Sequence, residues 1–520
     1  MKKAISLILV LALCLSLCSC ADYDHRKGND VAAAVQGLPA ASSIISGCKA
    51  ENYTMDITLD TENDIVSGTA TVQLTNTTTE DLSEICFRLY SANISSGEIT
   101  SAQNAETGTG YGIRVEKDPS VIYISLEDGL QPGATISVAL AFESAIPFIS
   151  NRFGHFCDAA GELYNLTFCF PQVAFLENGQ WHEDAYVENG ESHYYEMTDY
   201  HVTFHAPADY VVMASGKSQT EDGVTVIEAP NVREMAITAC NFAEIYTAET
   251  NGITINLLAP AFSDYSEECL TDLYDMFLAL SADALEVYSE AVGPYIYDEL
   301  DVIPTYYDNN VGGMEMPGLI QVGMWLPDEN SQLSYYDYLN SVTALVHEIG
   351  HQWFYCAVGN NTSKEPWLDE AFTSYLDRFY FCASDLYPSM LTSFAKEHDR
   401  DYDPEYPGEN GYINDALSMF NPEGFLYISE FDAAGYVNLP VADYSTEKYG
   451  LLVYANGAWL LRELELCMGT EDFSEMIGDW YEANNGGIVT GRAFVMHLLK
   501  YDSSDEVKAI LNEYLSDEYI

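Results

Sequence analysis

Basic residues are scarce in this sequence. Only 20 of its 520 residues are lysine or arginine, against 81 that are aspartate or glutamate, so the formal net charge is −61. Binding to nucleic acid needs clustered lysine and arginine, and this composition therefore excludes a nucleic-acid partner. The acidic surplus favours the solubility of an exported protein, and it would attract cationic substrates weakly over a screening length.

A disulfide framework and a long apolar run beyond the N-terminus are also missing. Three of the twelve cysteines lie within the first twenty residues, and the other nine show no Cys-x-x-Cys spacing. This scatter predicts mostly buried free thiols, although Cys157 and Cys169 could pair across a hairpin. No run of about 20 apolar residues follows the N-terminal segment, so no membrane-spanning helix is expected.

The N-terminus has the pattern of an export signal. Two lysines precede an apolar run over residues 4–17, which is too short to span a bilayer. The letters LCSC at residues 17–20 resemble a bacterial lipobox. We therefore expect a lipoprotein signal peptide over 1–19, lipidation of Cys20 and a flexible tether over 20–45. The protein would be exported and lipid-anchored on the outer face of a bacterial cell membrane; the alternative is an ordinary secretory signal and a secreted protein.

Hydrophobic periodicity divides the remaining chain in two. Over residues 46–250 apolar and polar residues alternate, as in YTMDITL (53–59), and turn residues separate the alternating segments. From about residue 266 the apolar residues recur at helical spacing, and Gly293-Pro294 ends the first predicted helix. The length also favours two or more domains. We predict an α+β multidomain protein, with an antiparallel β domain over 46–250 and a mostly helical domain over 251–520.

The segment VHEIGHQWF contains two histidines four positions apart, on a helix predicted over about 334–356. His347 and His351 would project from one face, one turn apart, as two ligands of one zinc ion require. Glu348 lies beside them, where it can take a proton from a water that the metal activates. The alternative is a pair of half-exposed histidines that bind backbone groups or water.

A third candidate ligand lies on the next predicted helix. Glu370, in EPWLDEAFTSYL (365–376), follows a proline suited to a first helical turn and has apolar neighbours at helical spacing. A helix–loop–helix of this length can bring Glu370 over His347 and His351. Two histidines and one glutamate leave a fourth zinc position open for water, which is typical of a catalytic site.

With its HEIGHQWF and PWLDEAF segments, the sequence resembles the gluzincin aminopeptidase family, which includes aminopeptidase N and leukotriene hydrolase. Glu370 follows His351 with eighteen residues between them, as in that family. The resemblance implies an N-terminal β saddle domain followed by a thermolysin-like zinc peptidase domain, and it covers most of the chain. The sequence looks like a bacterial lipoprotein member without the large C-terminal helical domain that many relatives carry.

A second segment, VGGMEMPGLI (311–320), is similar to the family's Gly-x-Met-Glu-Asn motif, with Met316 where asparagine is usual. The resemblance implies that Glu315 binds the free amino group of the substrate, in a loop that includes Gly312 and Gly313. A carboxylate near a metal-held carbonyl can hold an ammonium one residue from the chain end. The alternative is a glutamate in a glycine-rich turn.

A third segment, VYANGAWLLRELELCMG (453–469), is similar to the family's Tyr-Glu-Lys-Gly-Ala helix, with Ala-Asn in place of Glu-Lys. The resemblance implies that Tyr454 stabilises the developing oxyanion. Tyr449 is the rival for this role, and a buried packing phenol is the alternative. Asp377, two helical turns past Glu370, could accept the outer N–H of a zinc histidine, or it could be a solvated surface carboxylate.

Together these features predict a zinc-dependent aminopeptidase with one Zn2+ per chain and peptide substrates that have a free N-terminus. Zinc held by His347, His351 and Glu370 would activate the water that attacks the scissile carbonyl, with Glu348 as the base. Three alternatives stay open. They are a thermolysin-like endopeptidase, an epoxide hydrolase of the leukotriene hydrolase kind, and a non-catalytic surface protein that binds peptides.

Overall fold

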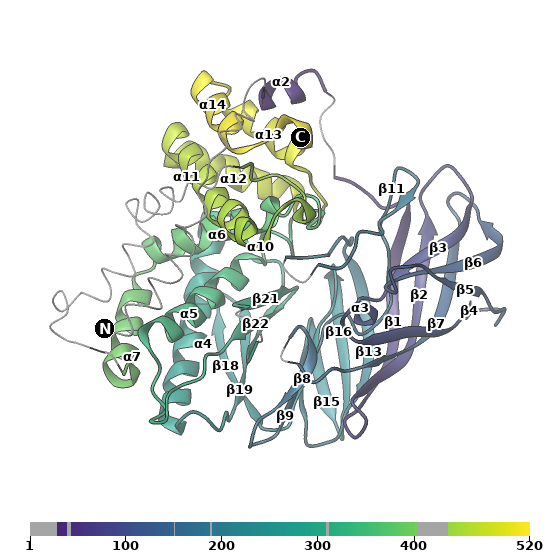
Figure 1. Ribbon diagram of the computed structural model, residues 1–520, viewed down its shortest axis with the longest axis horizontal. Coiled ribbons are helices and arrows are strands. Elements are labelled where there is room, and N and C mark those ends of the chain that lie inside the picture. The colour runs from purple at the N-terminus through teal and green to yellow at the C-terminus, as the bar shows by residue number, and fades with distance from the viewer. Residues whose placement is uncertain are drawn as a thin grey trace.

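A strand-rich half and a helix-rich half lie side by side in the computed structural model (Figure 1), which confirms the α+β class. The structure describes residues 29–38, 43–149, 151–187, 190–307, 311–400, 402 and 435–520. The predicted signal peptide, residues 1–19, and the lipidation site Cys20 lie outside the described residues.

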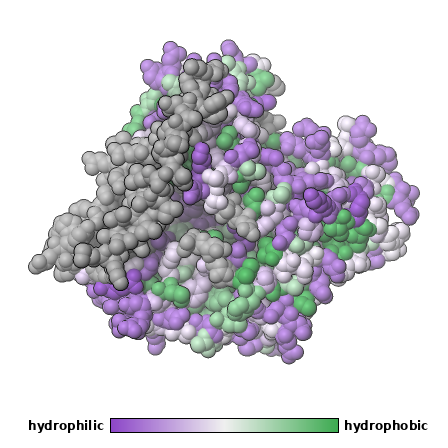
Figure 2. All heavy atoms as spheres, in the orientation of Figure 1, coloured by the Kyte–Doolittle hydropathy of each residue, from purple (hydrophilic) through white to green (hydrophobic). Residues whose placement is uncertain are grey.

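Hydrophilic side chains cover much of the face shown in Figure 2, as the acidic composition predicts. Within the described ranges, no helix is long and apolar enough to cross a membrane. The nine cysteines of these ranges are all free, and six of them are buried, so Cys157 and Cys169 are not paired. Mostly buried free thiols are what the scattered cysteine pattern predicts.

The strand-rich half contains a seven-stranded sheet with the order β15-β16-β13-β1-β2-β7-β4. Strand β1 is parallel to β13 and antiparallel to β2. Buried and exposed side chains alternate along β1, and Tyr53, Met55 and Ile57 of the YTMDITL pattern are buried. The sheet consists of β1 Cys48–Asp60, β2 Ile65–Asn76, β4 Ser96–Asn104, β7 Thr135–Ala145, β13 Thr198–His205, β15 Lys217–Glu221 and β16 Val224–Val232.

Two four-stranded sheets, ordered β10-β3-β6-β5 and β14-β17-β9-β8, and the hairpin β11-β12 complete this half. Their buried side chains join those of the large sheet in one hydrophobic core that includes Val72, Ile85 and Leu166. The elements are β3 Leu82–Arg88, α3 Ser91–Ile94, β5 Gly112–Val115, β6 Val121–Leu130, β8 Phe153–Cys157, β9 Glu162–Leu166, β10 Gln172–Val173, β11 Leu176–Glu177, β12 Gln180–Trp181, β14 Val211–Ala214 and β17 Ile237–Cys240.

A five-stranded sheet, ordered β18-β19-β20-β22-β21, packs against the helices of the other half. Its parallel strands β19, β20 and β22 are flanked by antiparallel strands at both edges. Strand β18 falls within residues 46–250, the range predicted for the β domain, yet it pairs with β19 and so belongs to this second sheet. The strands are β18 Ala243–Thr250, β19 Ile253–Pro260, β20 Glu299–Thr305, β21 Gly313–Met316 and β22 Leu319–Gly323.

The helices begin and end at local sequence signals. Helix α4 follows Ser266, whose side chain accepts a hydrogen bond from the backbone N–H of Cys269. Helix α5 begins with a capping box, in which Ser334 and Asp337 each accept the other's backbone N–H. The longer helices are α4 Glu267–Ala291, α5 Tyr335–Gly350, α6 Trp367–Ala383, α7 Leu386–His398, α11 Gly457–Met468, α12 Thr470–Asn484, α13 Gly491–Tyr501 and α14 Asp505–Tyr514. The short ones are α10 Thr446–Tyr449, the π-helix η3 Gly450–Asn456 and the 3-10 turns η2 Val441–Asp443 and η4 Asp517–Tyr519.

One part of the predicted tether is folded onto the helical half. Val31–Val35 form α2, which contacts α13 and α14 (Figure 1), and Val31 is fully buried. The amide of Asn29 donates to the backbone carbonyls of Asn512 and Leu515. Residues 31–35 are therefore docked, which differs from the flexible tether expected over 20–45. The sequence pattern did not indicate that Val31 and Val35 of this segment are buried against the helical half.

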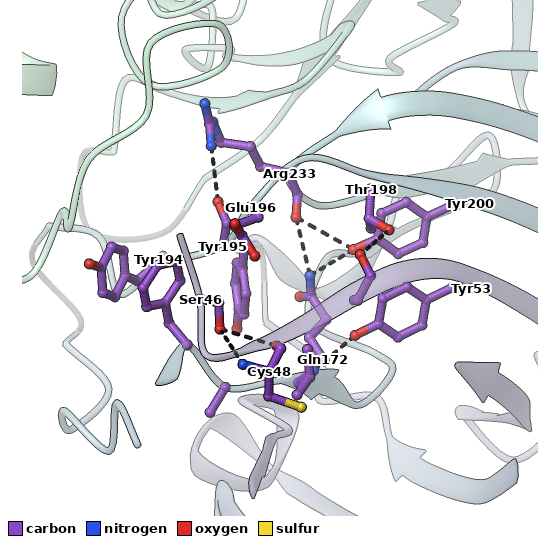
Figure 3. Close-up of a pocket in the computed structure, with 14 residues that line it drawn as sticks. Ser46, Cys48, Tyr53, Gln172, Tyr194, Tyr195, Glu196, Thr198, Tyr200 and Arg233 are labelled. Atoms are coloured by element: carbon purple, nitrogen blue, oxygen red, sulfur yellow. Dashed lines mark hydrogen bonds between the residues drawn. The ribbon is translucent and has the colours of Figure 1, made fainter. Parts of the chain in front are cut away.

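Arg233, which follows β16, links the two halves. It is 2% exposed, and its guanidinium points toward Tyr195 and away from Gln172 (Figure 3), beside a cavity of only about 20 Å³. A Cβ at Gly359 would lie 2.3 Å from the guanidinium carbon, so a side chain there would displace Arg233. The guanidinium donates to the carbonyl oxygens of Tyr195, Tyr355, Cys356, Ala357 and Gly487, at 2.6 to 3.1 Å. One side chain thus holds the β half against the segment that follows α5.

Replacing Arg233 with methionine should lower the free energy of unfolding by about 3 kcal/mol or more, because carbonyl oxygens at this contact lose a charged donor. Urea denaturation measures this loss. Arg114→Met is the matched control, since Arg114 pairs with Glu84 at a half-exposed surface and its loss should cost less than about 1 kcal/mol. Equal losses for the two variants would contradict the role of Arg233 as a link.

Candidate active site

Helices α5 and α6 pack together and bring the three predicted ligands into contact. His347 Nε2 lies 3.1 Å from His351 Nε2, and Glu370 Oε2 lies 3.3 Å from the former and 3.4 Å from the latter. In a tetrahedral site with zinc–nitrogen bonds of about 2.0–2.1 Å, neighbouring donor atoms lie about 3.3 Å apart. The triangle of donor atoms therefore has the size that one zinc ion needs.

The first helix ends earlier than the sequence predicts. Helix α5 stops at Gly350, and His351 is its C-cap, whereas the pattern predicted a helix over about 334–356. The backbone of His351 is still helical, with φ −61° and ψ −18°, and its N–H donates to the carbonyl of His347 at 3.2 Å. The spacing of one turn between the two imidazoles is therefore kept.

Carboxylates hold the outer nitrogens of both histidines. His347 Nδ1 lies 3.0 Å from Asp377 Oδ2, and His351 Nδ1 lies 2.6 Å from Asp369 Oδ1. A carboxylate accepts a hydrogen bond, so with a metal bound each Nδ1 would carry its hydrogen and each Nε2 would present its lone pair inward. Two lone pairs facing each other at 3.1 Å repel unless a cation lies between them. The donor set of this structure therefore fits a zinc ion.

Opposite charges set the pKa values within this group. Burial would lower the pKa of His347, but hydrogen bonds to Asp377 and Glu370 raise it to about 9. Burial would raise the pKa of Glu370, but the two histidines hold it well below its ordinary value. Glu370 is therefore an anionic carboxylate at neutral pH, as a metal ligand must be.

Glu348 lies against the edge strand β21. Its side chain is 5% exposed, and its Oε2 has no hydrogen-bond partner among the described residues. A Cβ at Gly313 would lie 2.5 Å from both Cγ and Oε1 of Glu348 and 2.7 Å from the backbone carbonyl of Gln321, whereas one at Gly312 would meet, among the described residues, the Ala344 methyl at 3.5 Å. Burial raises the pKa of Glu348 to about 7, although His347 and His351 act against the rise. The carboxyl group can therefore both take up and release a proton near neutral pH.

Glu315 lies on β21 and not in a turn, and it is 4% exposed. One of its oxygens lies within 4.8 Å of ligand atoms of both His351 and Asp369, which places it at the same site. Its Oε1 has no partner within the described part of the chain. Burial and then the charge of Glu191 raise the pKa of Glu315 well above its ordinary value. The charge of His351 acts against this rise.

Tyr454 and Tyr449 both reach the site, by different contacts. The Tyr454 hydroxyl donates to Glu370 Oε1, and its ring stacks on that of His347 at 5.9 Å between centroids. Tyr454 lies on the π-helix η3, a form that is frequent at functional sites. The Tyr449 ring packs edge-on against Tyr454 at 5.7 Å, and its hydroxyl has no hydrogen-bond partner in the described ranges. Burial, followed by the charge of Glu370, raises the pKa of Tyr454 well above its ordinary value, so the phenol keeps its proton.

Two residues of this site escaped the sequence analysis. Asp369 stands beside Glu370 in the PWLDEAF segment, but nothing in the pattern showed which carboxylate would face a histidine. Glu191 comes from the β half, where GESHYY carries no recognisable spacing. It is buried and accepts a hydrogen bond from Arg152 Nη1 at 2.7 Å, and its charge raises the pKa of Glu315, Glu348 and Asp369. The active site is therefore built by both halves.

Comparison with known proteins agrees with this geometry. Residues 278–514 match the peptidase family M1 domain, a range that includes Glu315, both histidines, Glu370 and Tyr454. Aminopeptidase 2 of Candida albicans is 24% identical over 216 residues, which are 40% of this chain and 20% of that protein. Aminopeptidase O of Rattus norvegicus is 24% identical over 280 residues, or 50% and 30% of the two chains, and human aminopeptidase B is 29% identical over 122 residues, or 23% and 18%. The matches thus span less than a third of these relatives. The chain therefore contains a segment that matches the peptidase family M1 domain, and its sequence is similar to those of aminopeptidases.

Proposed function

We propose that this protein is a zinc-dependent aminopeptidase that removes N-terminal residues from peptides. The observation that carries the proposal is a buried Glu315 carboxyl group, whose Oε1 has no hydrogen-bond partner among the described residues, beside a donor set of zinc geometry. The donor set supports hydrolysis, and the carboxyl group supports recognition of a substrate ammonium. An endopeptidase would not need this second feature.

His347 Nε2, His351 Nε2 and Glu370 Oε2 would hold the metal, one ion per chain. A bound zinc ion supplies Lewis-acid polarisation of a carbonyl group and lowers the pKa of water. Asp377 and Asp369 keep the two imidazoles in the tautomer and orientation that binding requires.

Glu348 would act as general base and then as general acid. Its unpartnered Oε2 can accept a proton from the attacking water, and its pKa of about 7 allows it to pass that proton to the leaving amine. Tyr454 would donate its hydroxyl hydrogen to the oxygen of the scissile carbonyl as negative charge develops there. In the free protein that hydroxyl donates to Glu370, so it already lies beside the ligands.

Glu315 would bind the free amino group of the substrate. Burial and the neighbouring charge of Glu191 disfavour the ionised form of Glu315, whose pKa they raise. A substrate ammonium would bring a positive charge that stabilises this carboxylate. Such an anchor fixes the distance from the chain end to the scissile bond, so cleavage removes one residue at a time.

We also propose, from the sequence alone, that the chain is exported and anchored on the outer face of a bacterial cell membrane through Cys20. A surface peptidase would act on peptides outside the cell. Incorporation of labelled palmitate into the wild-type chain, and its loss in Cys20→Ala, would test the anchor.

The central test compares aminoacyl fluorogenic substrates with free and N-acetylated amino groups. The wild type should cleave the free-amine substrates with a kcat/KM at least about 100-fold higher, because acetylation removes the charge that Glu315 binds. Glu315→Gln should lose most of this preference. Equal cleavage of both forms by the wild type would favour an endopeptidase, and no cleavage with added zinc would favour a peptide-binding protein.

Replacing Glu348 with glutamine should lower kcat by about 10² to 10⁴-fold, because the amide cannot take up a proton. Zinc content, measured by atomic emission, should stay at one per chain, since Glu348 is not a ligand. A variant that keeps the kcat of the wild type would remove Glu348 from the mechanism.

Gly313→Ala should lower kcat/KM by about tenfold or more, because the new methyl group meets the Glu348 carboxylate and the backbone carbonyl of Gln321 and displaces Glu348 from its place against β21. Gly112→Ala is the matched control, since Gly112 lies on β5 of the β half and its methyl group would make only an ordinary contact with Ser125 among the described residues. Circular dichroism would verify that both variants fold. Similar kinetics for the two would show that the position of Glu348 does not depend on Gly313.

A further inference from the structure

A buried row of ionisable side chains connects the β half to the turn that follows His351. Glu191 Oε2 accepts from Arg152 Nη1 at 2.7 Å and lies 2.5 Å from His193 Nε2. On the other side of the imidazole ring, His193 Nδ1 lies 2.8 Å from Glu234 Oε2, and the Tyr355 hydroxyl donates to Glu234 Oε1. All five side chains belong to residues that are no more than 5% exposed.

The two ends of this row reach different parts of the site. At one side, Glu191 follows Gly190, where a Cβ would lie only 2.9 Å from the hydroxyl of Tyr449, so this part of the row lies against a tyrosine of the site. At the other end, Tyr355 belongs to the turn that follows His351, and its φ of 97° is strained for a residue with a side chain. The backbone N–H of Cys356 in this turn donates to the carbonyl of His351 at 3.0 Å. The row therefore connects the amino-group site with the turn beside a metal ligand.

His193 is the central member, because both of its ring nitrogens face a carboxylate. Burial would lower the pKa of His193, but Glu234 and Glu191 raise it to about 10. Its backbone is fixed as well: the N–H donates to the Thr362 hydroxyl at 2.9 Å, and its carbonyl accepts from that hydroxyl at 2.8 Å. Thr362 lies in the loop between α5 and α6, so His193 is held by the same segment that connects the metal ligands.

We propose that His193 is a positioning residue for substrate binding, which holds Glu191 at the amino-group site and ties it through Glu234 to the turn after His351. The inference rests on the proposed aminopeptidase function. A buried row of ion pairs contributes little to stability compared with well-packed apolar residues. Its contact with the site, where Gly190 and Glu191 lie against Tyr449, gives it a use in binding that packing alone does not explain.

The test uses two ligands that differ only at the amino group, leucine hydroxamate and N-acetyl-leucine hydroxamate, with binding measured by calorimetry on the zinc-loaded protein. His193→Gln keeps the side-chain size but removes the positive charge between the two glutamates. Its affinity for the free-amine ligand should fall by about tenfold or more, while its affinity for the acetylated ligand should change less than about threefold. With a free-amine peptide substrate, KM should rise and kcat should change little.

His201→Gln is the matched control, since His201 pairs with Glu228 on the exposed surface of the same β half. Its affinity for both ligands should equal that of the wild type. Zinc content and thermal unfolding of every variant show whether a loss comes from the site or from the fold. If His193→Gln does not fold, Tyr355→Phe removes only the hydroxyl at the far end of the row, and it should show the same selective loss to a smaller degree.

An unchanged ratio of the two affinities in His193→Gln, or in Tyr355→Phe where that variant is used, would overturn the inference. A failure of the proposed function looks different, because the wild type would then bind the free and acetylated ligands equally. A wild type that prefers the free amine, combined with variants that keep the preference, would overturn the role of His193 alone.

Discussion

The structure depends on a surplus of buried carboxyl groups where the two halves meet. Glu191, Glu315, Glu348, Asp369 and Glu370 are each no more than 5% exposed. Buried carboxylates are costly unless cations face them, and the two histidines and Arg152 offset only part of this charge. The negative charge that these cations do not offset contributes, together with burial, to the raised pKa values of Glu315, Glu348 and Asp369. A divalent metal and a substrate ammonium would each lower the free energy cost of burying these carboxylates. The same charges would therefore affect both ligand binding and stability.

Because these groups come from both halves, the position of one half relative to the other is part of the site. The histidines, Glu370 and Glu315 belong to the helical half with its five-stranded sheet, while Glu191 comes from the β half. Arg233 and Thr362 fix the contact between them at points close to the site, and not at a distant surface. Small shifts between the halves would therefore change the distance from Glu191 to Glu315 before they disturbed either core.

The sequence predicted what depends on local geometry. His347, His351 and Glu370 lie in one short helix–loop–helix, where spacing alone decides which side chains meet, and the alternating pattern of β1 predicted its buried face. Glu191 could not be found in this way, because it precedes Glu315 by more than a hundred residues. Its place in the site depends on how the β half packs against the helical half. The same holds for Arg233, whose partners are backbone carbonyls that leave no trace in side-chain patterns.

The choice between Tyr449 and Tyr454 shows why spacing failed even at short range. In a regular α-helix, residues five apart are turned by about 140° from each other, so only one of the two could face the metal ligands. The chain instead forms a π-helix over Gly450–Asn456, with hydrogen bonds between residues five apart, and this turn brings both rings to one side. Both tyrosines therefore line the site, and the contact of the Tyr454 hydroxyl with Glu370 distinguishes them. A sequence pattern that assumes the α-helical period places only one of these two tyrosines at the site. The π-helix changes that period, and both side chains then lie on the same side.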